Sequence, residues 1–445
     1  MKIETSGENI NNENQHRKNG NNTKNKKVLQ MAVGDIAWIS TATALVMLMT
    51  PALGFFYAGL VRKKNLVSTL IQCLIIFAVM SLVWTFWGYS LTFGNSIGGI
   101  IGDMSLAGLN HIGINTISPY ATQIPELLFF AFQLKFAAIT PALIIGAFAE
   151  RIKFRSLLIF TILWSTVIYS PVAHWVWNVD GWLDVLGAVD FAGGIVIHIT
   201  AGFSALAAAL VIGRRKEDVE QDDNCCKEVE HKACNIPYVI LGAALLWFGW
   251  FGFNAGSALE ANALSVSALV ATNLAAAGAA VSWMIVDWVR KGKPSAVGIA
   301  VGAVCGLVAV TPASGFVTVS SAIIIGLIAG VVSNFVANWR AAKTRIDDSL
   351  DVFACHGMSG VWGSIATGLL ATTLVNDVNG LFYGNADLLV AQILSVIVVA
   401  AYSFIGSYIL LRVIDIFSPL RVSSEEESTG LDLSQHGEEA YDLGF

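Results

Sequence analysis

The chain has 445 residues, of which 55% are hydrophobic and only 13% are charged. Soluble globular proteins carry about 25% charged residues, so this composition, with a mean hydropathy of +0.65, indicates a polytopic membrane protein. The formal net charge of −6 excludes a broad basic face for nucleic acid, and six Cys over this length do not suggest a disulfide framework.

Residues 1–32 form a polar segment rich in Asn and Lys, without the apolar core of a signal peptide, and we expect a disordered tail. Residues 33–415 form a transmembrane domain of apolar blocks, each close to the ~20 residues that a helix needs to cross a bilayer. Residues 416–445 form a polar, acidic C-terminal tail. The predicted blocks are 36–60, 66–91, 124–149, 156–177, 193–212, 237–256, 266–289, 295–311, 320–338, 353–372 and 386–413.

The Lys and Arg residues between the blocks alternate strictly. All of them lie in the gaps after the first, third, fifth, seventh and ninth blocks, and the other gaps contain none. Because basic residues favour the cytoplasmic side, we predict an all-α membrane protein with eleven transmembrane helices, the N-terminus outside and the C-terminus inside.

Short motifs recur between blocks that are five apart. Residues 140–142 (TPA) recur at 311–313, residues 56–59 (FYAG) resemble 253–256 (FNAG), and His198 with Gly202 matches His356 with Gly360. Repeats of five helices must cross the membrane in opposite directions, so helices 1–5 and 6–10 are predicted to be inverted five-helix repeats. Membrane proteins of this kind place their pathway at the repeat interface, near the membrane midplane.

His198 and His356 occupy equivalent positions in the two repeats, each inside an apolar block. An ionisable residue at membrane depth is costly and usually faces a pathway. We expect a neutral pair of imidazole rings that lines a narrow pore, where it passes a proton or hydrogen-bonds a small polar solute. The alternatives are two separate histidines that bind neighbouring helices, or a metal site, for which two His alone are a poor ligand set.

Aromatic residues gather toward the outer ends of several blocks. Ring faces attract cations by about 0.5–2 kcal/mol each, so several rings and the Ser257 hydroxyl can hold a small cation without a carboxylate. Ordinary packing and interfacial belts are the alternative for most of the 13 Trp. The candidate rings are Phe132 and Phe136 in the third block, Trp164 in the fourth, and Trp250 and Phe253 in the sixth.

Two charged residues stand next to these candidates. Asp190 precedes the glycines that open the fifth block; its carboxylate is expected to cap the free backbone N–H groups there, and also to add negative potential to an outer vestibule. Lys135 is a cation inside an apolar block, and we expect its long side chain to reach toward the outer interface.

The loop after the fifth block contains Cys225, Cys226, His231 and Cys234, but their spacing does not fit a standard zinc site. We therefore predict no metal and no cofactor. The chain also has no nucleotide-binding loop and no hydrolase nucleophile motif, so it is predicted not to be an enzyme or an ATP-driven pump.

Five longer segments stand out in the chain: 50–60 (TPALGFFYAGL), 136–142 (FAAITPA), 190–198 (DFAGGIVIH), 249–257 (GWFGFNAGS) and 347–357 (DDSLDVFACHG). In these segments the chain resembles the ammonium transporter family (Amt/Mep, with the Rh proteins as distant relatives). The resemblance extends over roughly residues 33–443, and it is closer to prokaryotic Amt-type members than to the Rh branch.

The resemblance implies a homotrimeric ammonium transporter in the cell membrane, with one narrow pore in each subunit. Its cytoplasmic C-terminal tail is similar to the family's regulatory tail, which responds with the inner loops to PII-type signalling proteins in prokaryotic relatives. The roles that the resemblance implies are ammonium recruitment by Phe136, Trp164 and Ser257, a gate of Phe136 and Phe253, twin pore histidines His198 and His356, a structural vestibule acid Asp190, and weaker pore-lining candidates Phe132, Trp250 and Thr311.

The expected mechanism follows from the cost of charge in lipid. An intact ammonium ion is costly in an apolar lumen, whereas neutral ammonia crosses it easily. We expect ammonium to be bound outside, deprotonated, and conducted as ammonia, with the proton relayed separately along the histidine pair. The alternatives are an electroneutral ammonia channel, an ammonium sensor with little flux, and a water or urea channel, against which Trp164 and Ser257 argue.

Overall fold

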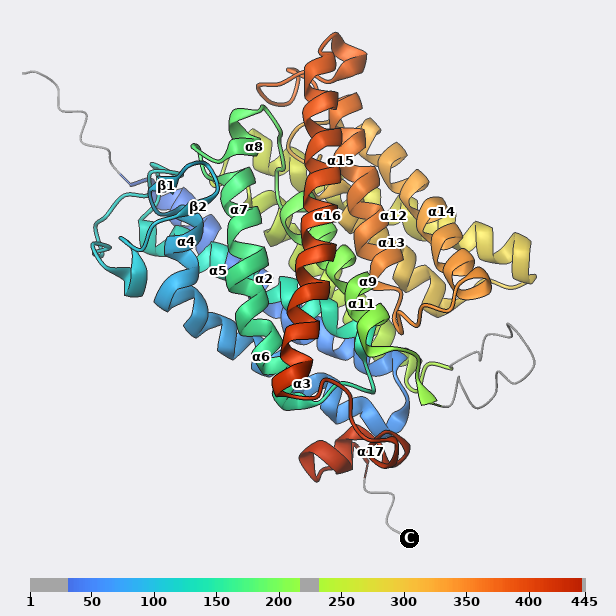
Figure 1. Cartoon of the computed structure of the whole chain (residues 1–445). Helices are drawn as coiled ribbons and strands as arrows, with labels where there is room; N and C mark the ends of the chain where they lie inside the picture. Colours follow the sequence, from blue (N-terminus) through green and yellow to red (C-terminus); the bar gives the residue numbers. More distant parts are fainter. Residues whose placement is uncertain (1–30, 217–231, 442–445) are drawn as a thin grey trace, which may run out of the picture.

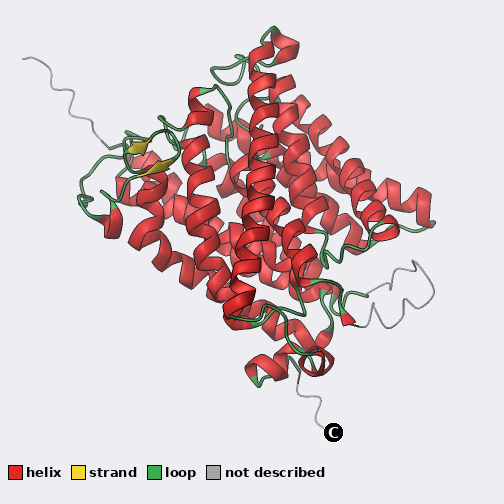
Figure 2. Cartoon of the chain, in the orientation of Figure 1, coloured by secondary structure: helices red, strands yellow, loops and turns green. Residues whose placement is uncertain are grey.

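The computed structural model describes residues 31–216 and 232–441, which form a bundle of helices with one short antiparallel hairpin (Figures 1 and 2). The long elements are α2 (Val33–Leu60), α3 (Leu66–Val83) continued by η2 (Trp84–Gly88) and α4 (Tyr89–Phe93), α5 (Glu126–Phe148), α6 (Phe154–Trp164) continued by η4 (Ser165–Tyr169) and α7 (Ser170–Trp177), η5 (Gly194–Ile199) with α9 (Thr200–Ile212), α11 (Ile236–Trp250) with η6 (Phe251–Ala255), α12 (Ala263–Lys291), α13 (Ala296–Val310), α14 (Val319–Lys343), η7 (Phe353–Met358) with α15 (Ser359–Leu370), and α16 (Ala386–Phe417). The short elements are η1 (Lys63–Asn65), β1 (Ser96–Ile97), β2 (Ile101–Gly102), η3 (Ala107–Leu109), α8 (Trp182–Val185), η8 (Leu381–Tyr383), α17 (Ser424–Thr429) and η9 (Asp432–His436).

Every predicted apolar block falls on one of these long elements. Nine of the helices in the described ranges are long and apolar enough to cross a membrane, which confirms a multi-pass helical membrane protein. The two remaining blocks form shorter helices: α13 has 15 residues and ends at Val310, and η7 with α15 forms the other. Eleven crossings and their orientation stay predictions.

The loops gather at two opposite ends of the bundle. The hairpin β1–β2 and the short helix α8 lie at one end, and α17 lies at the other (Figure 1). The first end joins the gaps after the second and fourth blocks, since the Trp182 N–H donates to the Gly99 carbonyl. At the second end Ile152, after the third block, pairs with Arg421 of the C-terminal tail. These contacts place the gaps after the second and fourth blocks at one end, and the gap after the third block with the C-terminal tail at the other.

The two histidine-bearing segments pack against each other reciprocally. A Cβ added to Gly202 of α9 would lie 2.2 Å from the Gly357 nitrogen in η7, and one added to Gly360 of α15 would lie 3.0 Å from the Gly194 oxygen in η5. Each of the two glycines stands four residues after a histidine. A glycine at the same distance after each histidine thus packs closely against the other histidine-bearing segment, which supports two related repeats.

Several sequence predictions concern residues outside the described ranges. Most of the predicted tail at 1–32 lies there, as do Cys225, Cys226 and His231. Cys234 is described and exposed, and its thiol contacts the Ala58 carbonyl oxygen at 3.3 Å. Within the described ranges, no group of three or more His, Cys, Asp or Glu side chains is placed to hold a metal ion.

Candidate functional site

A pocket of about 200 Å³ lies where the gaps after the second, fourth and sixth blocks meet. Seven of its eleven lining residues are aromatic, and such a wall is suited to a small cation. Four predicted site residues line it: Phe132, Phe136, Asp190 and Ser257. The other lining residues are Phe93, Tyr120, Phe129, Gln133, Trp177, Phe191 and Leu259.

A second cavity, the lumen, lies deeper in the bundle. Its volume of about 10 Å³ is close to the minimum for one water-sized molecule. His198, His356, Trp250 and Phe253 line it together with seven apolar residues, which are Met49, Leu53, Phe56, Ile139, Leu143, Leu246 and Val304. The lumen is therefore narrow and apolar apart from two imidazole rings and one indole.

Two phenylalanine rings stand between the pocket and the lumen. Phe136 lines the pocket, Phe253 lines the lumen, and their ring centroids are 4.5 Å apart. Phe132 packs edge-on against Phe136 with a centroid separation of 4.8 Å. Both rings are almost completely buried, so they fill the space between the pocket and the lumen.

The two histidines meet in the lumen. Their Nδ1 atoms are 3.2 Å apart, which requires one ring to donate and the other to accept, so at least the accepting ring is neutral in this arrangement. His198 also stacks on Trp250, with centroids 5.5 Å apart. The Trp250 indole N–H donates to the Thr311 hydroxyl at 2.9 Å. Thr311 thus positions Trp250, which in turn positions His198.

Asp190 holds the start of the turn that carries His198. Its carboxylate accepts four backbone N–H groups, those of residues 193–196, at 2.7 to 3.0 Å. Gly193, with φ of 113°, allows the chain to fold over the carboxylate. Burial raises the pKa of Asp190, and the four N–H bonds oppose that rise. The predicted capping role is confirmed, and the same residue also faces the pocket.

Asp348 does the same for His356, a role that the sequence analysis missed. Its carboxylate accepts the N–H groups of Val352 and Phe353 at 3.1 and 2.7 Å, at the start of η7. Burial raises its pKa to about 6 although Arg340 and the two N–H bonds act in the opposite direction. Both histidines therefore stand in π-helical turns, which are frequent at functional sites, and each turn is held by an aspartate.

The predicted position of Trp164 in the outer pocket is wrong. Its ring is fully buried among α6, α9 and α16 and does not belong to the pocket wall. Its indole N–H lies 3.0 Å from the Ser204 hydroxyl and 3.1 Å from the Ser407 hydroxyl. Trp164 thus joins three helices away from the path.

Trp177, at the end of α7, occupies the pocket instead. Its ring centroid is 6.0 Å from that of Phe136, and its indole N–H donates to the Asp190 carbonyl oxygen at 2.9 Å. The third aromatic wall of the predicted recruitment site is therefore present, but a different tryptophan forms it. Lys135 lies away from the pocket, with its Nζ 5.0 Å from the ring centroid of Phe77 on α3.

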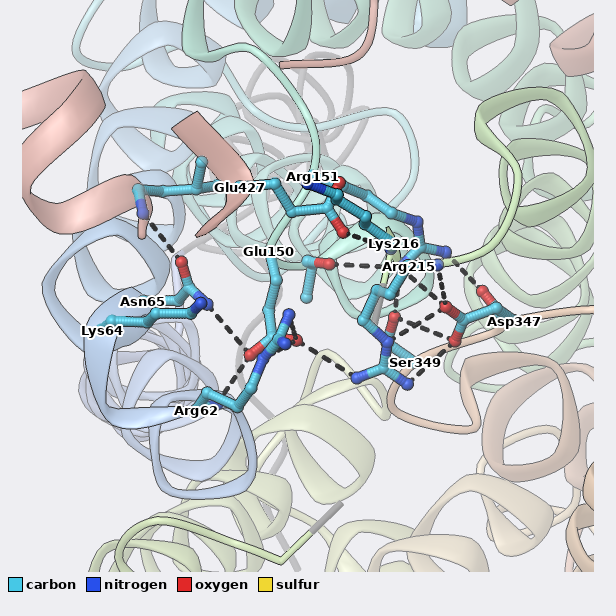
Figure 3. Close-up of polar contacts among 12 residues, drawn as sticks. Arg62, Lys64, Asn65, Glu150, Arg151, Arg215, Lys216, Asp347, Ser349 and Glu427 are labelled. Carbon is cyan, nitrogen blue, oxygen red and sulfur yellow. Dashed lines mark hydrogen bonds and ion pairs between the residues drawn. The ribbon is translucent and has the colours of Figure 1, made fainter. Parts of the chain in front are cut away.

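At the α17 end of the bundle, buried ion pairs join the inner loops (Figure 3). The fully buried Glu150 carboxylate accepts from Arg62 at 3.0 Å, Asn65 at 3.0 Å and Arg215 at 3.2 Å. Arg215 also donates twice to Asp347, at 3.0 and 2.9 Å. Burial by itself would raise the pKa of Glu150, but Arg215 and Arg62 reverse this and lower it to about 2.

The C-terminal tail docks on this cluster. Asp432 accepts the N–H groups of Val67 and Ser68 at 3.0 and 2.7 Å, and so caps the start of α3. The Leu431 N–H donates to the Asn65 side-chain oxygen at 2.8 Å. Asn65 thus contacts both the tail and Glu150, which connects the tail to the inner loops.

Comparison with known proteins agrees with this architecture. Residues 37–441 match the family model described as Ammonium Transporter Family. The chain is 48% identical to "Ammonium transporter Amt1" of Archaeoglobus fulgidus over 92% of this chain and all of that one, and 45% identical to the "Ammonium transporter" of Bacillus subtilis over 92% and 99%. Among solved structures it is similar to Saccharomyces cerevisiae Mep2, with a TM-score of 0.85, 34% identity and 93% of both chains covered. It is also similar to a protein described as "Sensor Amt Protein", with a TM-score of 0.84, 31% identity, and coverage of 91% of this chain and 98% of that chain.

A bundle of apolar helices that encloses an aromatic pocket and a narrow apolar lumen defines a multi-pass membrane protein. The chain belongs to the ammonium transporter family, as its sequence motifs predicted. Its relatives are named transporters, which indicates a transport role rather than catalysis, and the plasma membrane is the usual location of such proteins.

Proposed function

We propose that the protein takes up ammonium by binding the ion in the outer pocket and conducting ammonia through the lumen. One observation carries this proposal: the Phe136–Phe253 contact separates a pocket suited to a cation from an apolar cavity that holds the hydrogen-bonded histidine pair. A cation is stable on the first side of this gate, whereas a neutral molecule is favoured on the second.

The chain's own groups suggest how the ion is handled. The rings of Phe136 and Trp177 and the Ser257 oxygen replace part of the hydration of ammonium at the pocket. A proton must leave before the molecule enters the lumen, and the touching rings of His198 and His356 offer it a separate route. Potassium has a similar charge but no proton to release, so the apolar lumen excludes it.

A second candidate function is an ammonium sensor with little flux. The similarity to a protein described as "Sensor Amt Protein" favours it, because that likeness covers 98% of the other chain. In such a protein the same pocket would bind ammonium, and the signal would leave through the tail rather than through the lumen.

Current from the purified protein in proteoliposomes, after an ammonium jump and with potassium as the control, separates these functions. A sustained inward current specific to ammonium supports the transporter with a relayed proton. No current but a rise in internal pH, reported by a trapped dye, identifies an electroneutral ammonia channel. Neither a current nor a change in internal pH, with ammonium still bound, identifies the sensor.

We further propose that three such subunits form a homotrimer, each with its own pore, and that the tail is regulatory. The contacts of Asp432 with the start of α3 and of Leu431 with Asn65 support a tail that senses the inner loops. A PII-type protein that binds this surface would displace the tail. Light scattering in detergent tests the trimer, and a chain ending at residue 416 tests the tail, since its current should no longer respond to such a partner.

A further inference from the structure

Gln133 lies in the wall of the outer pocket and has no role in the proposed mechanism so far. It belongs to α5, where it stands four residues after Phe129, one after Phe132 and three before Phe136. At helical spacing these residues share one face, and all four line the pocket. Gln133 is thus the amide side chain set among the rings that flank the gate.

The side-chain oxygen of Gln133 is buried and has no hydrogen-bond partner within the described ranges. A buried acceptor without a partner costs free energy, and buried amide oxygens in folded proteins are usually bonded. The position therefore calls for a donor that the pocket receives from outside.

The donors that already line the pocket are committed elsewhere. The Tyr120 hydroxyl donates to the Phe93 carbonyl at 3.2 Å, and the Trp177 indole N–H donates to the Asp190 carbonyl at 2.9 Å. The Ser257 hydroxyl donates to the carbonyl oxygen of Phe253, in the next turn back, at 2.8 Å, which leaves the lone pairs of its own oxygen free. Apart from the amide N–H group of Gln133 itself, the side chains of the described wall therefore offer acceptors rather than donors.

We propose that Gln133 is a specificity-determining residue whose side-chain oxygen accepts an N–H of ammonium in the pocket, together with the Ser257 oxygen. This inference rests on the proposed function. Ammonium offers four N–H donors and a charge, and hydrogen bonds from a charged donor are about twice as strong as neutral ones. Potassium offers no donor and is coordinated by rings of oxygens, which one amide and one hydroxyl do not supply. Loss of the proton weakens the bond, so Gln133 holds the ion and releases ammonia.

Two substitutions test this role. Gln133→Met keeps the length of the side chain but removes the acceptor, and it should raise the ammonium concentration for half-maximal binding about tenfold, equivalent to about 1.4 kcal/mol. Gln133→Glu keeps an acceptor oxygen, and it should bind ammonium at least as tightly as the wild type.

Binding is measured on the purified full-length protein as the rise in its thermal unfolding midpoint with ammonium, with potassium in parallel. Half-saturation of the proteoliposome current is measured separately. If folded Gln133→Met binds ammonium like the wild type, or if both variants lose the same affinity, the inference is overturned. If ammonium stabilises the wild type but drives no current or ammonia flux, the transport proposal fails while the Gln133 inference is still decided by the binding data.

Discussion

Replacing Trp177 with Leu should weaken ammonium binding without unfolding the protein. The centroids of Trp177 and Phe136 are 6.0 Å apart, so a cation seated between them lies within the ~6 Å over which a ring face attracts it. Loss of one such ring removes about 0.5–2 kcal/mol. The half-saturating ammonium concentration should therefore rise by about 2- to 30-fold.

Two control variants separate the possible causes. Trp177→Phe keeps a ring but loses the N–H bond to the Asp190 carbonyl, so its shift should be smaller than that of Trp177→Leu. Trp164→Phe loses the bonds to two serines, but Ser407 still donates to Ser204 at 2.8 Å. It should lower stability by about 1–3 kcal/mol, from lost hydrogen bonds and a small void, with half-saturation unchanged.

The measurements are the ammonium dependence of the proteoliposome current and the thermal unfolding midpoint of the same preparations. The assignment of Trp177 to the pocket would be refuted by the opposite result. In that case the half-saturating ammonium concentration rises strongly in Trp164→Phe but stays at the wild-type value in Trp177→Leu. It would also show that the pocket is not where ammonium binds.

Three further predictions concern the titratable groups. The pKa of Glu150, about 2 in the folded protein, lies below its ordinary value of ~4.3, so its ionised form stabilises the fold at neutral pH. Glu150→Gln should therefore lower the free energy of unfolding at neutral pH by about 3 kcal/mol. In unfolding experiments this loss should shrink as the pH falls from about 4 toward 2. The pKa of Asp348, about 6, lies above its ordinary value of ~3.9, so its stabilising contribution is full below about pH 4 and is lost as the pH rises to 6. In the wild type this contribution makes the unfolding midpoint depend on pH between 4 and 6, and Asp348→Asn should remove that dependence. An unchanged pH dependence in the variant would contradict the prediction. His198→Asp should change the ammonium current or admit potassium, and an unchanged current with unchanged exclusion of potassium would rule out the proton relay.

The helical blocks could be predicted because membrane-spanning helices are selected by a single property, an apolar length. Where the prediction was least regular, at 295–311, the structure has a helix of only 15 residues, α13. Here the helix ends at Val310, although the apolar composition continues beyond it, whereas α5 continues through the same motif at Pro141. Composition therefore locates the helices but does not set their ends.

The histidine pair could be predicted because the chain repeats itself, whereas the gate of Phe136 and Phe253 was predicted from the family resemblance. His198 and His356 have the same neighbours in blocks five apart, and a twofold relation brings equivalent residues together at its axis. Phe253 matches Phe56 by the same rule, and both line the lumen. Residues duplicated by the repeat were thus placed from sequence alone, without knowledge of the loops.

Trp164 was misplaced although the predicted topology argued against it. The fourth block begins at the inner side, and Trp164 stands ten residues after the start of α6 at Phe154, about 15 Å along the helix. Trp177 lies a further thirteen residues along the same run, at its outer end. Depth along the helix therefore favours Trp177. The assignment of Trp164 relied on residue type alone, and residue type says nothing about depth in the membrane.

Asp348 and Gln133 show which roles a sequence can reveal and which it cannot. Asp190 stands eight residues before His198, and Asp348 stands eight before His356, so the repeat contained a signal for the second cap, which the sequence analysis did not use. Gln133 has no such signal, because its role depends on which donors around it are already used. The directions of the Ser257 and Trp177 donors are set by carbonyl groups of neighbouring turns and loops. Symmetry can therefore predict the lumen, which both repeats build, but the acceptor character of the pocket arises only when the loops have folded over it.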